Sequence, residues 1–156
     1  MRNTKNITIL DDKTELKFKL TAMSARAQQK WLARLIGIVI KSGLLKADGD
    51  ENITDLSGIA RAITKSGFAF LGQIDAEEAE KLLLDLVCET AVKLTGRGVI
   101  PLDEREIDNT FSQLQALFEL EKQCFGINFD FFKDGGALSG LATLINNSQT
   151  SKASNS

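Results

Sequence analysis

The chain has 156 residues, of which 43% are hydrophobic and 26% are charged, and its formal net charge is −2. This composition fits one soluble domain with its own core, and it argues against a protein that wraps nucleic acid with its whole surface. The charge is uneven, because residues 1–47 hold ten Lys and Arg against three Asp and Glu, whereas residues 48–156 hold nine against eighteen. The sequence therefore predicts a basic front part and an acidic remainder.

The N-terminal segment and the cysteines favour a protein of the reducing cytoplasm. The apolar run near Met1 is too short and too interrupted for a signal peptide, and no later segment is long enough to span a membrane. The only cysteines, Cys88 and Cys124, lie among apolar residues in helical patterns, which is the usual setting of buried free thiols.

Residues 6–22 alternate between apolar and polar side chains around the turn D-D-K-T. Leu16, Phe18 and Leu20 share one side of this segment, with lysines between them. The alternation predicts a β-hairpin whose apolar row packs on the helices that follow. An exposed hairpin edge would also support self-association, so a homo-oligomer is one expected assembly.

The next stretch, residues 23–45, predicts an amphipathic helix with both ends marked. Ser24 is placed as its N-cap, and Gly43 is placed as its stop. The polar side carries the basic stripe, which we define as Arg26, Lys30 and Arg34. The opposite side carries an apolar stripe that includes Trp31, Leu32, Leu35, Ile36, Ile38, Val39 and Ile40.

A polar turn and a second helix are expected next. Asp48, Asp50 and Asn52 occupy alternate positions, as the ligands of a calcium loop do, but the glycine after the third ligand and the closing glutamate are absent, so we expect no metal there. The second helix is expected from Asp55 to Gly72.

Two further helices carry capping-box signatures. The first is expected from Ile74 to Leu94, with Asp75 as its N-cap, and it ends at the glycines of T-G-R-G. V-I-P-L then reads as an extended connector, and Asp103 with Glu106 begins a helix that continues to Phe125.

Four phenylalanines occur between Phe125 and Phe132, and they predict a short strand or an irregular aromatic plug. The expected fold is therefore mainly α: a four-helix globular domain with an N-terminal β-hairpin and a short Phe-rich extended segment near the C-terminus. We expect this domain to span residues 1–133. Residues 134–156 are expected to form a flexible C-terminal extension.

Catalytic constellations are weak in this sequence. The chain has no histidine, so the thiols have no imidazole to activate them. The acidic pairs Glu77 with Glu80 and Asp103 with Glu106 lie in first helical turns, where capping and the helix dipole account for them. We therefore expect no enzymatic activity, no cofactor and no metal.

The basic stripe is the clearest charged feature, although a solvated face is its default interpretation. If the stripe binds a partner, one candidate is an acidic protein surface. The alternative is a small nucleic-acid-associated regulatory protein that uses this helix face. The stripe lacks interleaved aromatic residues and the remaining chain is acidic, so we favour the protein partner.

The order of these segments resembles the tail assembly chaperones of tailed bacteriophages. The resemblance covers residues 14–133 and rests on F-K-L-T-A-M-S-A running into R-A-Q-Q-K-W-L-A-R-L-I-G-I-V-I-K-S-G, then on E-E-A-E-K-L-L-L-D-L-V-C and F-G-I-N-F-D-F-F before a flexible end. It implies a small, mainly helical, non-enzymatic protein of the host cell cytoplasm that is absent from the mature virion.

The resemblance also implies the partners: the tape measure protein, which the chaperone coats, and the tail tube protein, which a C-terminal extension recruits. On that extension the candidate contacts are Leu138, Leu141 and Ile145. An apolar groove between helices is a common receptor for a helical partner. Candidate groove residues are Leu35, Val39, Leu82, Leu86, Phe111 and Phe118, although core packing explains each of them alone.

Overall fold

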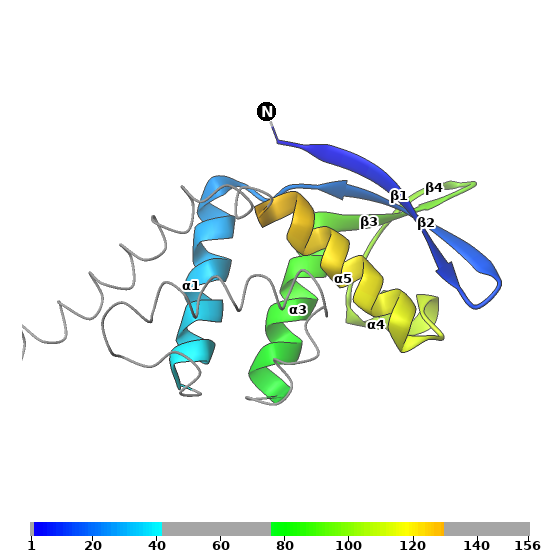
Figure 1. Ribbon diagram of the computed structural model, residues 1–156. Coiled ribbons are helices and arrows are strands. Elements are labelled where there is room, and N and C mark those ends of the chain that lie inside the picture. Colours follow the sequence, from blue (N-terminus) through cyan, green and yellow to red (C-terminus); the bar gives the residue numbers. More distant parts are fainter. Residues whose placement is uncertain (1, 42–75, 130–156) are drawn as a thin grey trace, which may run out of the picture.

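A computed structural model describes residues 2–41 and 76–129, except for the side chains of residues 39–41 (Figure 1). The elements run in the order β1 (Thr4–Asp11), β2 (Thr14–Thr21), α1 (Ala25–Lys41), α3 (Ala76–Thr90), β3 (Ala91–Thr95), β4 (Gly98–Pro101), α4 (Glu104–Thr110) and α5 (Leu114–Phe129). The described part of the chain thus combines one sheet with four helices.

The sheet is antiparallel, and its strands lie in the order β1-β2-β3-β4. The expected hairpin is present as β1 and β2, which a two-residue turn joins at Asp12 and Lys13. Asp12 has a φ of 56°, a left-handed conformation that aspartate tolerates better than most residues with a side chain. The alternation along β2 buries its apolar residues on one face, namely Leu16, Phe18 and Leu20.

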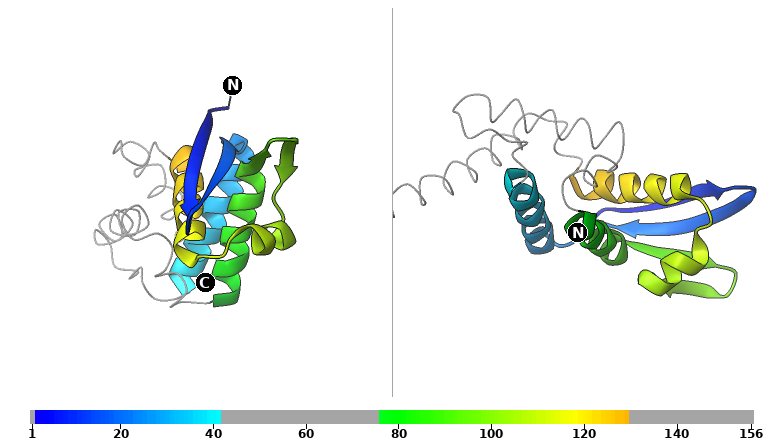
Figure 2. Two further views of the ribbon diagram at one scale, coloured as in Figure 1. Left: turned by 90° about the vertical axis from the view of Figure 1, so that its right-hand side faces the viewer. Right: turned by 90° about the horizontal axis from the view of Figure 1, so that it is seen from below.

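Helix α5 covers that face of the sheet, and α3 and α1 follow beyond it. Helix α5 packs against β1 and β2, α3 packs against α5, and α1 packs against α3. Figures 1 and 2 show this succession, with α1 far from the tip of the β1–β2 hairpin and α5 along the strands. The core therefore lies between the sheet and α5 and continues between the helices.

Aromatic side chains fill the junction between α1 and α5. The Trp31 ring centroid lies 5.2 Å from that of Phe129 and 6.0 Å from that of Phe125. The Trp31 indole also donates a hydrogen bond from Nε1 to the Leu82 carbonyl at 2.8 Å. Ser24 begins α1 as expected, since its Oγ accepts from the Ala27 N–H at 3.2 Å.

The expected mainly α fold is wrong, because the sheet has four strands and two of them lie in the C-terminal half. The third predicted helix ends at Thr90, and residues 91–95 form β3, which pairs with β2. The glycines of T-G-R-G join β3 to β4, and the expected connector forms most of β4. In the β1–β2 hairpin alone, one edge of β2 would have no hydrogen-bonded neighbour. Pairing of β3 with this edge outweighs the helical spacing of Val92.

The expected continuous helix from Asp103 to Phe125 is also interrupted. Asp103 does begin α4, and its Oδ1 accepts from the Glu106 N–H at 2.8 Å. However, α4 ends at Thr110 and α5 begins at Leu114. The Phe-rich segment was expected to be extended, but it is helical up to Phe129. In a helix, Phe125 and Phe129 lie one turn apart on the same face, and both rings contact Trp31.

Several predictions fall on residues that the structure does not describe. These are the acidic turn at residues 48–52, the second helix from Asp55 to Gly72, and the C-terminal extension at residues 134–156. The domain limits at residues 1–133 and 134–156 therefore stay predictions.

Candidate partner-binding groove

A cavity of about 410 Å³ lies between α3, α4 and α5. We call it the α3–α5 groove and define it by its lining residues: Ala76, Ala79, Glu80, Leu83, Leu84, Val87, Glu104, Ile107, Asp108, Leu117, Phe118 and Glu121. Eight of these lining residues are apolar, including Ala76, and the other four are acidic. A cavity of this size falls in the range of ligand-binding pockets.

The wall from α3 follows from helical geometry. Ala79, Leu83 and Val87 are spaced four residues apart, so they form one ridge along the groove. Leu82 and Leu86 point away from the groove into the core, where both are fully buried. Because α3 is apolar on both sides, it can serve the core and still present apolar side chains to a partner.

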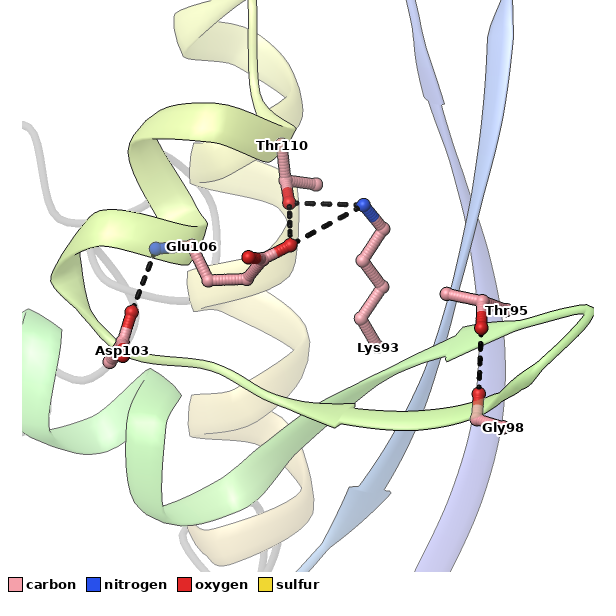
Figure 3. Close-up of polar contacts among 6 residues, drawn as sticks. All are labelled: Lys93, Thr95, Gly98, Asp103, Glu106 and Thr110. Atoms are coloured by element: carbon pink, nitrogen blue, oxygen red, sulfur yellow. Dashed lines mark hydrogen bonds and ion pairs between the residues drawn. The ribbon is translucent and has the colours of Figure 1, made fainter.

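The wall from α4 is held in place by β3. The Lys93 ammonium donates to Thr110 Oγ1 at 3.2 Å and lies 3.8 Å from Glu106 Oε1, while Thr110 donates to the same carboxylate (Figure 3). These contacts tie Glu106 and Thr110, one turn apart on a helix of only seven residues, to β3. The opposite side of α4 then presents Ile107 and Asp108 to the groove.

The start of α5 is held by Asp11 at the end of β1. Its carboxylate accepts hydrogen bonds from the Ser112 N–H at 2.9 Å, the Ser112 hydroxyl at 3.0 Å and the Gln113 N–H at 2.9 Å. The bond from the Ser112 backbone contributes most to lowering the pKa of Asp11. Asp11 thereby satisfies the free N–H groups ahead of α5 and sets where Leu117, Phe118 and Glu121 lie.

Glu121 is the unusual residue of the groove. Its exposed fraction is only 6%, and its Oε2 atom has no hydrogen-bond partner among the described residues. Burial raises the pKa of this carboxyl from 4.5 to about 7. The other acidic side chains of the lining, Glu80, Glu104 and Asp108, add negative charge around it.

The two thiols have the character of core residues. Cys124 is buried and Cys88 is half-buried, and neither forms a disulfide. Burial raises the pKa of both thiols, and the nearby Asp85 carboxylate raises that of Cys88 further. Both are therefore protonated at neutral pH and are poor nucleophiles.

Within residues 2–41 and 76–129, no group of three or more Cys, Asp or Glu side chains is arranged to hold a metal ion. None of the helices in this part of the chain combines the length and the apolar character that a membrane span requires.

The predicted partner residues lie elsewhere. Arg26 and Lys30 are exposed on α1, whereas the Arg34 guanidinium donates to the Asp85 carboxylate of α3 at 2.6 Å. None of the three lines the groove. Leu138, Leu141 and Ile145 lie outside the described residues. Their binding roles, and that of the basic stripe, stay predictions.

Of the six candidate groove residues, one lines the cavity: Phe118. Leu35, Leu82 and Leu86 are core residues, Phe111 stacks on Phe18 at 5.7 Å, and the side chain of Val39 is not described. Sequence reasoning missed Leu83, Leu84 and Glu121. The available signal was the four-residue step from Leu117 to Glu121, which places a carboxylate on a half-buried row of α5.

The arrangement defines an α+β domain, with helices against one face of an antiparallel sheet, that presents an apolar groove with an acidic lining. The model of the family described as "Phage tail assembly chaperone protein, TAC" matches residues 15–140, which is most of the chain. The protein therefore belongs to this family of phage tail assembly chaperones. No curated protein and no solved structure matches the chain significantly.

Proposed function

We propose that this protein is a non-enzymatic chaperone that binds the tape measure protein of a phage tail and recruits tail tube subunits during tail assembly. The observation that carries this proposal is the family match along residues 15–140. The place of action is then the host cytoplasm, and the chaperone leaves before the virion is complete.

The α3–α5 groove supports the first half of this function. A tape measure protein is a long helical polypeptide, and its apolar stripes must be shielded until the tail tube surrounds it. Helical stripes of this kind dock in apolar grooves between helices. Leu83, Leu84 and Phe118 are half-buried side chains at the groove, so a partner helix would remove further apolar surface from water there.

The C-terminal extension at residues 134–156 supplies the second half of the proposal. Leu138, Leu141 and Ile145 are spaced as a short apolar stripe that a tail tube subunit can contact. A tube subunit held there would be at high effective concentration next to the bound tape measure protein. Arg26 and Lys30 offer a separate basic contact for an acidic protein face.

The nucleic-acid alternative uses the basic stripe on α1. Arg34 is already paired with Asp85, which neutralises one of the three charges that phosphates would need. The structure thus provides no observation that favours DNA over a protein partner, and we keep the protein partner.

Co-expression with the tape measure protein of the same phage tests the proposal. We expect the wild-type chain to keep that protein soluble and to co-purify with it. Leu83→Gln should reduce the recovered complex about fivefold or more, because it places an amide in the groove wall. The matched control is Leu114→Gln, since Leu114 is 63% exposed and lies outside the groove lining. A tape measure protein that stays insoluble beside the folded wild-type chain would refute the proposed function.

A further inference from the structure

Glu121 occupies a site that the core does not explain. A carboxylate removed from water loses several kcal/mol of hydration unless hydrogen bonds or a cation replace it. Only 6% of Glu121 is exposed, and its Oε2 atom has no hydrogen-bond partner among the described residues. The cavity that it lines is open to a partner group that would supply the missing bond.

The described residues that line the groove contain four carboxylates and no cation. The lysine of β3, Lys93, does not line the groove and is already engaged by Glu106 and Thr110 of α4 (Figure 3). The charged side chains of the lining are therefore all negative, while the rest of the lining is apolar. This combination selects a positively charged group carried on an apolar surface.

We propose that the α3–α5 groove recognises an amphipathic helix whose apolar stripe contains a lysine or arginine, and that the cation of this residue pairs with Glu121. The inference deepens the proposed function and rests on it, because it specifies the chemistry of the segments that the chaperone holds. A Lys or Arg side chain suits the site, since its aliphatic stem packs along Leu83 and Leu117 while its charged end reaches the carboxylate.

The pairing makes capture dependent on pH. Because the pKa of Glu121 is about 7 in the free chain, a bound cation must favour its ionised form, and binding releases a proton near neutral pH. The other titratable groups around Glu121 are Glu80 on α3, Glu104 and Asp108 on α4, and Cys124 on α5. Affinity for such a helix should therefore fall as the pH decreases through about 7, where Glu121 takes up its proton.

The probes for the test are overlapping synthetic peptides of about 20 residues that cover the tape measure protein of the same phage. Their binding to the full chain is measured by fluorescence anisotropy. We expect the peptides that bind to carry a Lys or Arg within an apolar stripe. Replacing that residue by norleucine keeps most of the stem but removes the charge, and it should weaken binding about tenfold.

The complementary variant is Glu121→Gln, which preserves the shape of the side chain. It should also lower the affinity for the unmodified peptide about tenfold. For the norleucine peptide it should lower the affinity little further, because both changes remove the same ion pair. The matched control is Glu89→Gln, an exposed position on α3 outside the groove lining, which should leave affinity unchanged. Circular dichroism confirms that each variant is folded.

The outcomes separate the two proposals. If peptides bind but neither norleucine nor Glu121→Gln changes their affinity, the cation pairing is refuted while the proposed function stands. A loss with Glu121→Gln that is fully additive with norleucine would also refute the pairing, since the two groups would then act independently. If no peptide binds and co-expression fails as well, the proposed function falls and this inference falls with it.

Discussion

Two buried polar residues on α5, two turns apart, show different uses of the same helix. Asn128 is satisfied by its neighbours: Oδ1 accepts from the Met23 N–H at 2.7 Å, and Nδ2 donates to Thr90 Oγ1 at 2.8 Å and to the Cys124 carbonyl at 2.9 Å. Glu121 is also buried, yet its Oε2 atom has no hydrogen-bond partner among the described residues.

The difference separates the C-terminal part of α5, which serves the fold, from the middle of α5, where we propose recognition. The Asn128 contacts tie α5 to the start of α1 and to the junction of α3 with β3, so the chain gains a unique arrangement there. An unsatisfied carboxylate at Glu121 lowers stability without specifying any contact. A residue that costs stability beside an apolar cavity is better explained by a partner than by the core.

The largest effect should come from the satisfied residue. Asn128→Leu leaves the Met23 N–H and the Thr90 hydroxyl without their buried partner, and we expect it to lower the free energy of unfolding by about 2–4 kcal/mol. Urea denaturation followed by circular dichroism measures this loss. Gln115→Leu, an exposed position on the same helix, is the control and should change stability little. If Asn128→Leu lowered the free energy of unfolding as little as Gln115→Leu does, Asn128 would not be a stabilising residue and its contrast with Glu121 would be lost.

Glu121→Gln should raise the free energy of unfolding near pH 8, whereas Asn128→Leu lowers it. The folded-state pKa of about 7 lies above the ordinary value of 4.5, so the folded state holds the proton more tightly and stability falls as pH rises between these values. The glutamine variant does not titrate there, and we expect it to be roughly 1–3 kcal/mol more stable than wild type near pH 8, with no advantage near pH 4. Urea denaturation across pH measures the difference between the two proteins.

Two details sharpen this second test. The depressed pKa of Asp11 acts in the opposite sense, since its contribution is present above about pH 3.8 and is lost as pH falls below that value. Comparing wild type with the glutamine variant at each pH cancels Asp11, because both proteins contain it. A stability difference that does not change with pH would show that Glu121 has an ordinary pKa.

The smallest effect is expected on α1. The Arg34 and Asp85 side chains are roughly half exposed, so a double-mutant cycle with alanine at both positions should give a coupling energy below about 1 kcal/mol that decreases with salt. Thermal unfolding at low and high salt measures it. A coupling above about 2 kcal/mol would mean that this pair, rather than the interior of α5, organises the helices.

Local signals in the sequence predicted the hairpin and the starts of α1 and α4. Ser24 and Asp103 each place an oxygen where a helix leaves a free N–H group, and these interactions do not depend on the rest of the fold. Strands β3 and β4 were missed because residues 91–94 extend the apolar spacing of α3. The pairing of β3 with β2 depends on a strand more than seventy positions earlier in the chain, and β4 pairs in turn with β3.

The groove was missed for a related reason. The sequence suggested one continuous helix from Asp103 to Phe125, but the break between α4 and α5 resets the helical phase and leaves Leu114 exposed. The new phase turns Leu117 and Glu121 towards α3. A glutamate in a helix is normally assigned to the solvent side, and this expectation outweighs the local signal of the four-residue step from Leu117 to Glu121.

Hydrogen–deuterium exchange of the chain, free and bound to the tape measure protein, tests the groove most directly. Binding in the α3–α5 groove should slow amide exchange in α4 and in the first turns of α3 and α5, while β1 and β2 exchange as before. Slowing confined to the β1–β2 hairpin or to α1, with α4 unchanged, would contradict the assignment of this groove as the recognition surface.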